Sequence, residues 1–120
     1  MKSLLVLCAA VMSTNAFAAE VQSAKYNAAK KAIELVVSYG GGCKEHKFKL
    51  DMGACQESSP VSCEANLVDL TEGDFCEAYL TKTVLITLKE AGLNNSYYSG
   101  ASITIKGDGE TEATVTLPRF

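Results

Sequence analysis

The chain has 120 residues, 11 Lys or Arg against 14 Asp or Glu, and a formal net charge of −3. Basic and acidic residues alternate along it without forming a block. This argues against a nucleic-acid partner and against an anionic membrane surface, since both need clustered positive charge.

The first 18 residues have the features of a signal peptide. Lys2 precedes an apolar run from Leu4 to Met12, and Ala16-Phe17-Ala18 provides the small-x-small pattern of a cleavage site. The run is shorter than the roughly 20 residues that span a bilayer. We therefore expect cleavage after Ala18, export to the periplasm or the medium, and a single mature domain of residues 19–120 without a membrane span.

Alternating apolar and polar residues predict about seven short β-strands in the mature chain. The predicted strands are residues 20–26, 33–39, 46–52, 63–70, 83–89, 101–106 and 111–117. Gly107-Asp108-Gly109 predicts a hairpin turn between the last two. This spacing favours an all-β fold, an antiparallel β-sandwich of immunoglobulin-like type, with a small closed barrel as the alternative.

One helical turn is predicted near residues 74–81. Asp74 is placed to cap a helix N-terminus, with Glu77 three residues later. The β-branched residues that follow limit this helix to one or two turns.

Cysteine spacing predicts two disulfides. Cys8 belongs to the signal peptide, and four cysteines remain in a small exported domain. Three pairings are possible. We favour Cys55 with Cys63, because these two bracket a polar, turn-forming segment between two predicted strands, and this leaves Cys43 with Cys76.

His46 is the only histidine and lies three residues after Cys43. A cysteine nucleophile would need a free thiolate beside the imidazole, and an oxidised Cys43 cannot supply one. We expect His46 on the apolar face of its strand with Phe48 and Leu50, hydrogen-bonded at the edge of the core. The glycines at 40–42 predict a sharp bend, since no phosphate-loop Lys-Ser/Thr follows.

Metal binding has weak support, and no cofactor is expected. The spacing of Cys43 and His46 is similar to that of a first pair of zinc ligands, but no second closely spaced pair follows. Oxygen ligands suit hard cations, which makes weak metal candidates of Asp69, Glu72, Asp74 and Glu77. Their spacing matches no calcium loop, and a solvated acidic turn explains them equally well.

Tyr97 and Tyr98 lie in a predicted loop between Asn94 and Gly100. Aromatic residues of this kind anchor interfaces, so both are candidate binding residues. Packing of one tyrosine over the end of the core explains the pair equally well.

Two motifs resemble those of a family of small, uncharacterised exported bacterial proteins and lipoproteins. The motifs are Gly-Gly-Cys-Lys-Glu-His, here residues 41–46, and Asp-x-Cys-Glu-Ala, here residues 74–78. The resemblance implies that Cys43 and Cys76 are paired. It implies no activity, and it does not cover Cys55 and Cys63.

These observations favour a non-enzymatic binding or structural module of the cell envelope. Its partner would be a protein or another envelope component, which the sequence does not identify. One alternative is an inhibitor of a secreted or periplasmic hydrolase, such as a protease or lysozyme, because a stapled loop loses little entropy on binding. The other alternative is a divalent-metal-binding protein.

Overall fold

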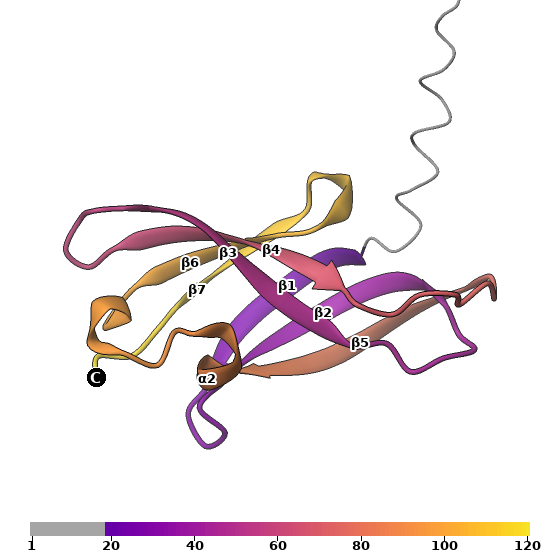
Figure 1. Cartoon of the computed structure of the whole chain (residues 1–120), viewed down its shortest axis with the longest axis horizontal. Coiled ribbons are helices and arrows are strands. Elements are labelled where there is room, and N and C mark those ends of the chain that lie inside the picture. Colours follow the sequence, from indigo (N-terminus) through magenta and orange to yellow (C-terminus); the bar gives the residue numbers. More distant parts are fainter. Residues whose placement is uncertain (1–18) are drawn as a thin grey trace, which may run out of the picture.

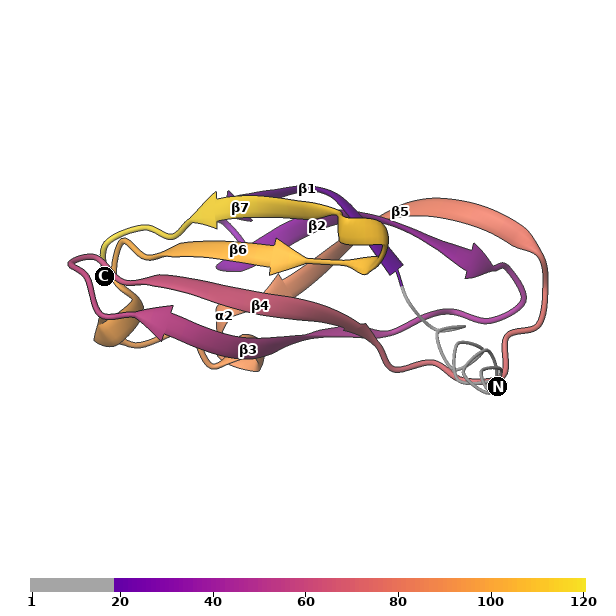
Figure 2. The same cartoon turned by 90° about the horizontal axis from the view of Figure 1, so that it is seen from above.

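A computed structural model describes residues 19–120 as a β-sandwich of two packed sheets (Figures 1 and 2). The predicted signal peptide, residues 1–18, lies outside the described residues. The all-β prediction is confirmed, with seven strands in a three-stranded and a four-stranded sheet. The immunoglobulin-like type stays a prediction. None of the helices between residues 19 and 120 has the length and apolar character of a membrane span.

The three-stranded sheet has the order β1-β2-β5 and is antiparallel throughout. Its strands are β1 (Ala19–Asn27), β2 (Ala32–Gly41) and β5 (Ala78–Thr87). The central strand β2 buries one face against the opposite sheet, through Ile33, Leu35, Val37 and Tyr39. These are the residues whose alternation predicted the strand.

The four-stranded sheet has the order β3-β4-β6-β7 and is mixed. Its strands are β3 (Phe48–Gln56), β4 (Ser62–Asp69), β6 (Ser102–Lys106) and β7 (Glu112–Thr116). β4 and β6 are parallel, so the prediction of a purely antiparallel sandwich is wrong at this pair. The reason is the connection: the chain leaves β4, crosses to the other sheet as β5, and returns through a long loop that enters β6 in the direction of β4.

The sandwich core lies between β2 and the β4-β6 pair. Ile33, Leu35 and Val37 pack in one cluster with Cys63, Ala65, Ile103 and Ile105, all nearly inaccessible to solvent. Cys63 therefore contributes its sulfur to the core as well as to a disulfide.

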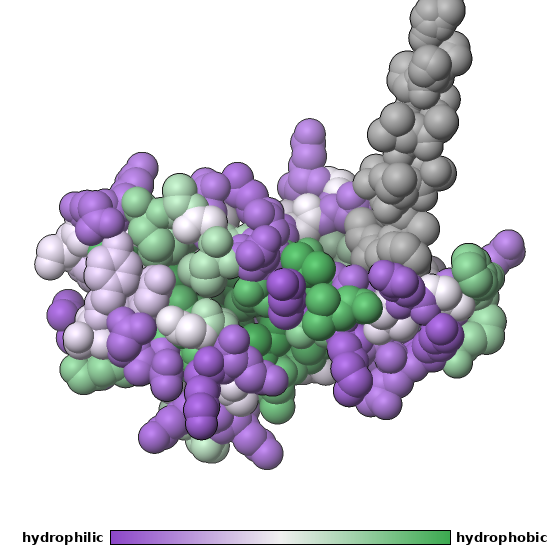
Figure 3. All heavy atoms as spheres, in the orientation of Figure 1, coloured by the Kyte–Doolittle hydropathy of each residue, from purple (hydrophilic) through white to green (hydrophobic). Residues whose placement is uncertain are grey.

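The two long edges of the sandwich differ. On one side β1 lies along β7, and the Val21 backbone N–H donates to Thr111 Oγ1 at 2.9 Å. On the other side a groove of about 400 Å³ runs between β3 and β5, with Phe48, Leu50 and Val84 among its walls. Figure 3 shows an apolar area near the middle of this view, with mixed polar and apolar residues on both sides of it.

The helix predicted near 74–81 is absent: residues 71–77 are irregular and β5 begins at Ala78. The short helix is α2 (Leu88–Ala91), directly after β5. Thr87 and Glu90 form a capping box there, and Gly92 ends the helix in a left-handed conformation. The Thr-x-x-Glu pattern of residues 87–90 was present in the sequence but overlapped the end of the predicted strand 83–89.

Candidate functional site: the loops at the Cys43–Cys76 end

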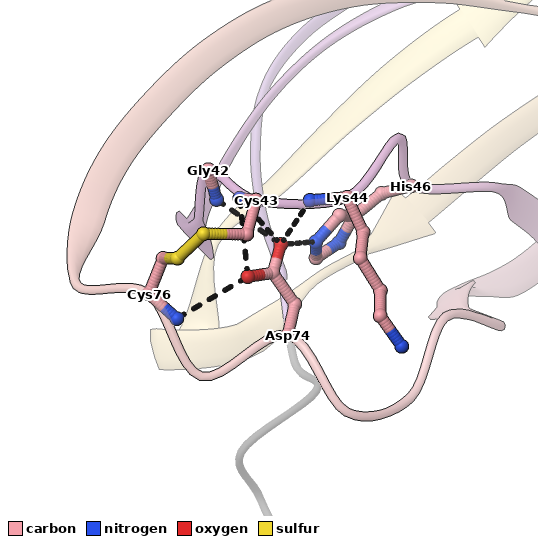
Figure 4. The surroundings of a disulfide bond; sticks show 6 residues. All are labelled: Gly42, Cys43, Lys44, His46, Asp74 and Cys76. Atoms are coloured by element: carbon pink, nitrogen blue, oxygen red, sulfur yellow. Dashed lines mark hydrogen bonds and ion pairs between the residues drawn. A yellow bond between two sulfur atoms is a disulfide. The ribbon is translucent and has the colours of Figure 1, made fainter.

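Two loops meet at one end of the sandwich. Residues 42–47 connect β2 to β3, and residues 70–77 connect β4 to β5. The disulfide between Cys43 and Cys76 joins the two loops (Figure 4). The second disulfide joins Cys55 to Cys63 across the β3-β4 hairpin. These are the pairings that cysteine spacing favoured.

The Asp74 carboxylate is the centre of this end. It accepts backbone N–H groups from Gly42 at 3.1 Å, Cys43 at 3.2 Å and Lys44 at 3.1 Å, and from Cys76 at 3.3 Å (Figure 4). Successive N–H groups that converge in this way form an anion-binding concavity, or nest. In this protein the nest is filled by the chain's own carboxylate.

The same contacts explain why the predicted helix does not form. Asp74 was expected to cap donors in its own segment, and only Cys76 is such a donor. The other backbone donors come from a loop about thirty residues earlier. Asp74 therefore joins the two loops instead of capping a helix in its own segment.

Glycine is required where the first loop approaches Asp74. Gly41 has φ 149° and Gly42 has φ 114°, conformations that other residues rarely adopt. A Cβ atom on Gly41 would lie 2.9 Å from the carboxyl carbon of Asp74 and 2.9 Å from His46 Nε2. The predicted bend is therefore a place where backbone must pass against a buried ionic group.

His46 lies between two aspartates. Its Nδ1 is 2.6 Å from Asp69 Oδ2, and its Nε2 is 2.7 Å from Asp74 Oδ2. All three side chains are buried, with exposed fractions of 3%, 1% and 2% for His46, Asp69 and Asp74. A neutral imidazole has a single N–H, so it can donate to only one carboxylate. The geometry therefore favours the imidazolium form, which donates to both.

Electrostatic effects agree with this assignment. Burial opposes the charge of His46, but hydrogen bonds to Asp74 and Asp69 outweigh it and raise the pKa of the imidazole. The hydrogen bond from His46 holds the pKa of Asp74 far below its usual range, with help from the backbone N–H groups. Burial, and then the charges of the two aspartates, raise the pKa of Tyr39.

His46 is not a strand residue, because β3 begins two residues later at Phe48. It is nevertheless packed as expected at the edge of the core. Its ring lies 4.4 Å from the ring of Tyr39 and 6.3 Å from that of Phe48, measured between centroids. The two hydrogen bonds to aspartates hold His46 in the loop instead of extending β3.

This arrangement leaves little capacity for catalysis. Cys43 is oxidised, and both nitrogens of His46 are engaged. A general base needs a free lone pair within reach of a substrate proton, and the imidazolium form has none. The polar groups at this end are hydrogen-bonded to one another.

The acidic metal candidates do not form a common binding site in the structure. Asp69 and Asp74 contact opposite nitrogens of His46, while Glu72 and Glu77 are exposed. Within residues 19–120 the one group of three close potential ligands is Cys43, Asp74 and Cys76, and its two sulfurs are bonded to each other.

Phe75 is the feature that the sequence reasoning missed. Its side chain is 87% exposed, although its neighbours Asp74 and Cys76 are fastened to the opposite loop. Leu70 in the same loop is 53% exposed, and Tyr79 at the start of β5 is 64% exposed. The sequence carried no direct signal for this exposure, because it depends on the contacts that Asp74 and Cys76 make with the other loop.

The two predicted binding tyrosines lie at the other end of the molecule and differ from each other. Tyr98 packs against the core. Tyr97 is 44% exposed, lies edge-on to Tyr98 and donates its hydroxyl to Glu57 at 2.7 Å. Tyr98 therefore packs over the core, and a binding role for Tyr97 stays a prediction.

Comparison of the chain with protein-family models, curated proteins and solved structures gives no match.

Proposed function

We propose that this protein is an exported, non-enzymatic binding module that docks onto a protein partner through the loop carrying Phe75. The observation that carries the proposal is a large apolar side chain, 87% exposed, between two residues that are both fastened in place. A side chain with no internal role and this much exposed surface is the kind that anchors an interface.

Rigidity of the loop supports the proposal on energetic grounds. Binding usually costs about 0.5–1.5 kcal/mol for each flexible side chain that is immobilised, with a further cost for ordering a loop. Here a disulfide and four backbone hydrogen bonds to Asp74 order the loop before any partner arrives. Phe75 is thus presented on a scaffold that loses little further freedom.

Export is part of the proposal. Ala16-Phe17-Ala18 supplies the cleavage pattern, and two disulfides in a domain of this size persist in an oxidising compartment. The envelope is therefore the setting in which we place the partner. Membership of the family with the Gly-Gly-Cys-Lys-Glu-His and Asp-x-Cys-Glu-Ala motifs is likewise a proposal, and these are the motifs that meet around Asp74.

An inhibitor of a protease or lysozyme is the second candidate. It is favoured by the same pre-ordered loop, because a protruding aromatic on a stapled scaffold can occupy an enzyme cleft at low entropic cost. The two candidates differ in the partner: an enzyme inhibited at 1:1 stoichiometry, or an envelope protein with no change in activity.

The test is capture of envelope proteins by immobilised residues 19–120, with Phe75→Ser as the decisive variant. We expect the parent protein to retain one partner and Phe75→Ser to weaken it at least about tenfold, with an unchanged melting temperature. Tyr97→Ser is the matched control, since it removes an exposed aromatic from the opposite end. Equal retention by the parent and Phe75→Ser would refute the role of the loop. Titration of a panel of lysozymes and proteases separates the inhibitor from the binding module.

A further inference from the structure

The helix α2 lies away from the loop that carries Phe75 (Figure 1). A second cavity lies beside this helix. Its volume is about 560 Å³, within the usual size of small-molecule sites. Three segments that are distant in sequence form it: the β1-β2 turn, the start of α2 and the segment after β7. Its walls include Tyr26 from β1, Leu88 from α2 and Phe120.

Three lysines surround this cavity: Lys30, Lys31 and Lys89. No acidic residue is among the described residues that line it. Within residues 19–120, none of the three ammonium groups makes an ion pair with a carboxylate. The chain as a whole is acidic, with 14 Asp or Glu against 11 Lys or Arg. Three unpaired cations around one cavity are therefore a local reversal of the overall charge.

The lysines are held together by backbone contacts. Lys31 has a left-handed φ of 50°, and its carbonyl accepts the Leu88 backbone N–H at 3.0 Å. This bond ties the β1-β2 turn to the first residue of α2. The capping box of Thr87 and Glu90 fixes α2 in turn, so Lys89 stays beside the turn that carries Lys30.

The floor of the cavity is apolar. Leu88 is almost fully buried, Tyr26 packs against the core, and Phe120 is 55% exposed. A ligand that matches both parts has an apolar body and a single negative group. A small anion without an apolar body would bind the exposed lysines only weakly in water. An apolar molecule without a charge would leave the lysines without a counter-charge.

We propose that this cavity binds a small amphipathic acid, an apolar body carrying one carboxylate or phosphate group. The acid binds as a free molecule, with its anionic group among the ammonium groups of Lys30, Lys31 and Lys89 and its apolar body against Tyr26, Leu88 and Phe120. This ligand class and this end of the molecule are independent of the Phe75 loop.

The test is calorimetric titration of residues 19–120 with dodecanoate below its micellar concentration. We expect saturable 1:1 binding of dodecanoate. Dodecanol, which has the apolar chain without the charge, and inorganic phosphate, which has the charge without the chain, should not bind in this way. The double variant Lys30→Gln with Lys89→Gln should bind at least about tenfold more weakly, because it removes two of the three cations. The matched control is Lys49→Gln with Lys82→Gln, which removes the same charge from exposed strand positions and should bind like the parent.

Three outcomes would overturn the proposal. They are an absence of saturable binding, equal binding by the two double variants, and binding only to phosphatidylglycerol vesicles with none to the monomeric acid. The last result would mean a membrane-surface contact in place of a ligand cavity. Melting temperatures of both double variants show whether each is folded.

Discussion

The two ends of the sandwich are ordered by different forces. At the Cys43–Cys76 end, a disulfide and a buried ionic network around Asp74 hold the loops. At the other end a capped helix and apolar packing do so: Leu88 and Leu93 are buried, and Leu93 N–H donates to the Leu88 carbonyl at 2.8 Å. The difference has a physical consequence. The Cys43–Cys76 end, which we call the polar end, should depend on redox state and on pH. The other end, which we call the apolar end, also carries a disulfide, Cys55–Cys63, but the packing of α2 there should not depend on pH between pH 6 and 9.

The largest expected effect comes from breaking the disulfide at the polar end. Cys43→Ala with Cys76→Ala opens a link between residues 33 apart, for which chain entropy predicts a loss of about 4 kcal/mol. Cys55→Ala opens a link between residues 8 apart, worth about 2.5 kcal/mol, and leaves the buried Cys63 sulfur in the core. The first variant should melt on the order of 20 °C below the parent and about 4–8 °C below the second variant. Equal melting temperatures would show that the polar end contributes no more than the local hairpin bridge.

Removal of the Asp74 charge should have the next largest effect. In Asp74→Asn one carboxylate oxygen becomes an amide N–H₂ group. Some of the N–H donors of residues 42–44, or the buried Nε2–H of His46, then lose their acceptor. We expect the melting temperature to fall on the order of 10 °C. Glu72→Gln is the control, since it removes an exposed charge from the same loop. A fall of the same size in Glu72→Gln would mean that net charge matters and the nest does not.

The pH dependence of stability should come from the polar end. Because folding raises the pKa of His46, its stabilising contribution is complete below its unfolded pKa of about 6.5 and is lost as pH rises through the folded value. Because folding lowers the pKa of Asp74, its contribution is present above about pH 4 and is lost on acidification through the folded value. Stability should therefore be greatest between about pH 4 and 6.5.

Melting curves between pH 6 and pH 9 test the His46 half of this expectation. The melting temperature of the parent should fall across this range, because the raised pKa of His46 is passed, and that of His46→Gln should change little. A parallel decline in both proteins would assign the pH dependence to other groups.

The smallest expected effect is at the apolar end. Thr87→Ala removes the N-cap of α2, whose hydroxyl accepts the Glu90 N–H at 3.0 Å, at a cost of about 1 kcal/mol. This cost should be the same at pH 6 and pH 9, because the capping contact does not involve His46. Thr83→Ala, which removes an exposed strand threonine, is the comparison for a lost methyl and hydroxyl. A strong pH dependence of the Thr87→Ala cost would remove the contrast between the two ends.

Much of the fold was readable in the sequence because it depends on short-range patterns. Alternation in Ile33, Leu35 and Val37 predicted β2, since side chains along a strand point to opposite faces. The polar, turn-forming residues 56–60 lie between Cys55 and Cys63, and this short spacing favoured a bridge between the two cysteines. The candidate site was less readable, because the importance of Phe75 depends on what its neighbours contact in another loop.

The sequence by itself determined the number and approximate positions of the strands, the favoured disulfide pairing and the burial of its single histidine, all of which follow from periodicity, spacing and composition. Only the tertiary structure decided which strands pair, and the parallel β4-β6 contact could not be read from either strand alone. It also decided that Asp74 accepts N–H groups from residues 42–44 instead of capping a helix, and that Lys30 and Lys89 share a cavity. The physical reason is that hydrogen-bond acceptors and charges take the partners that folding brings nearest, and those partners lie far away in the chain.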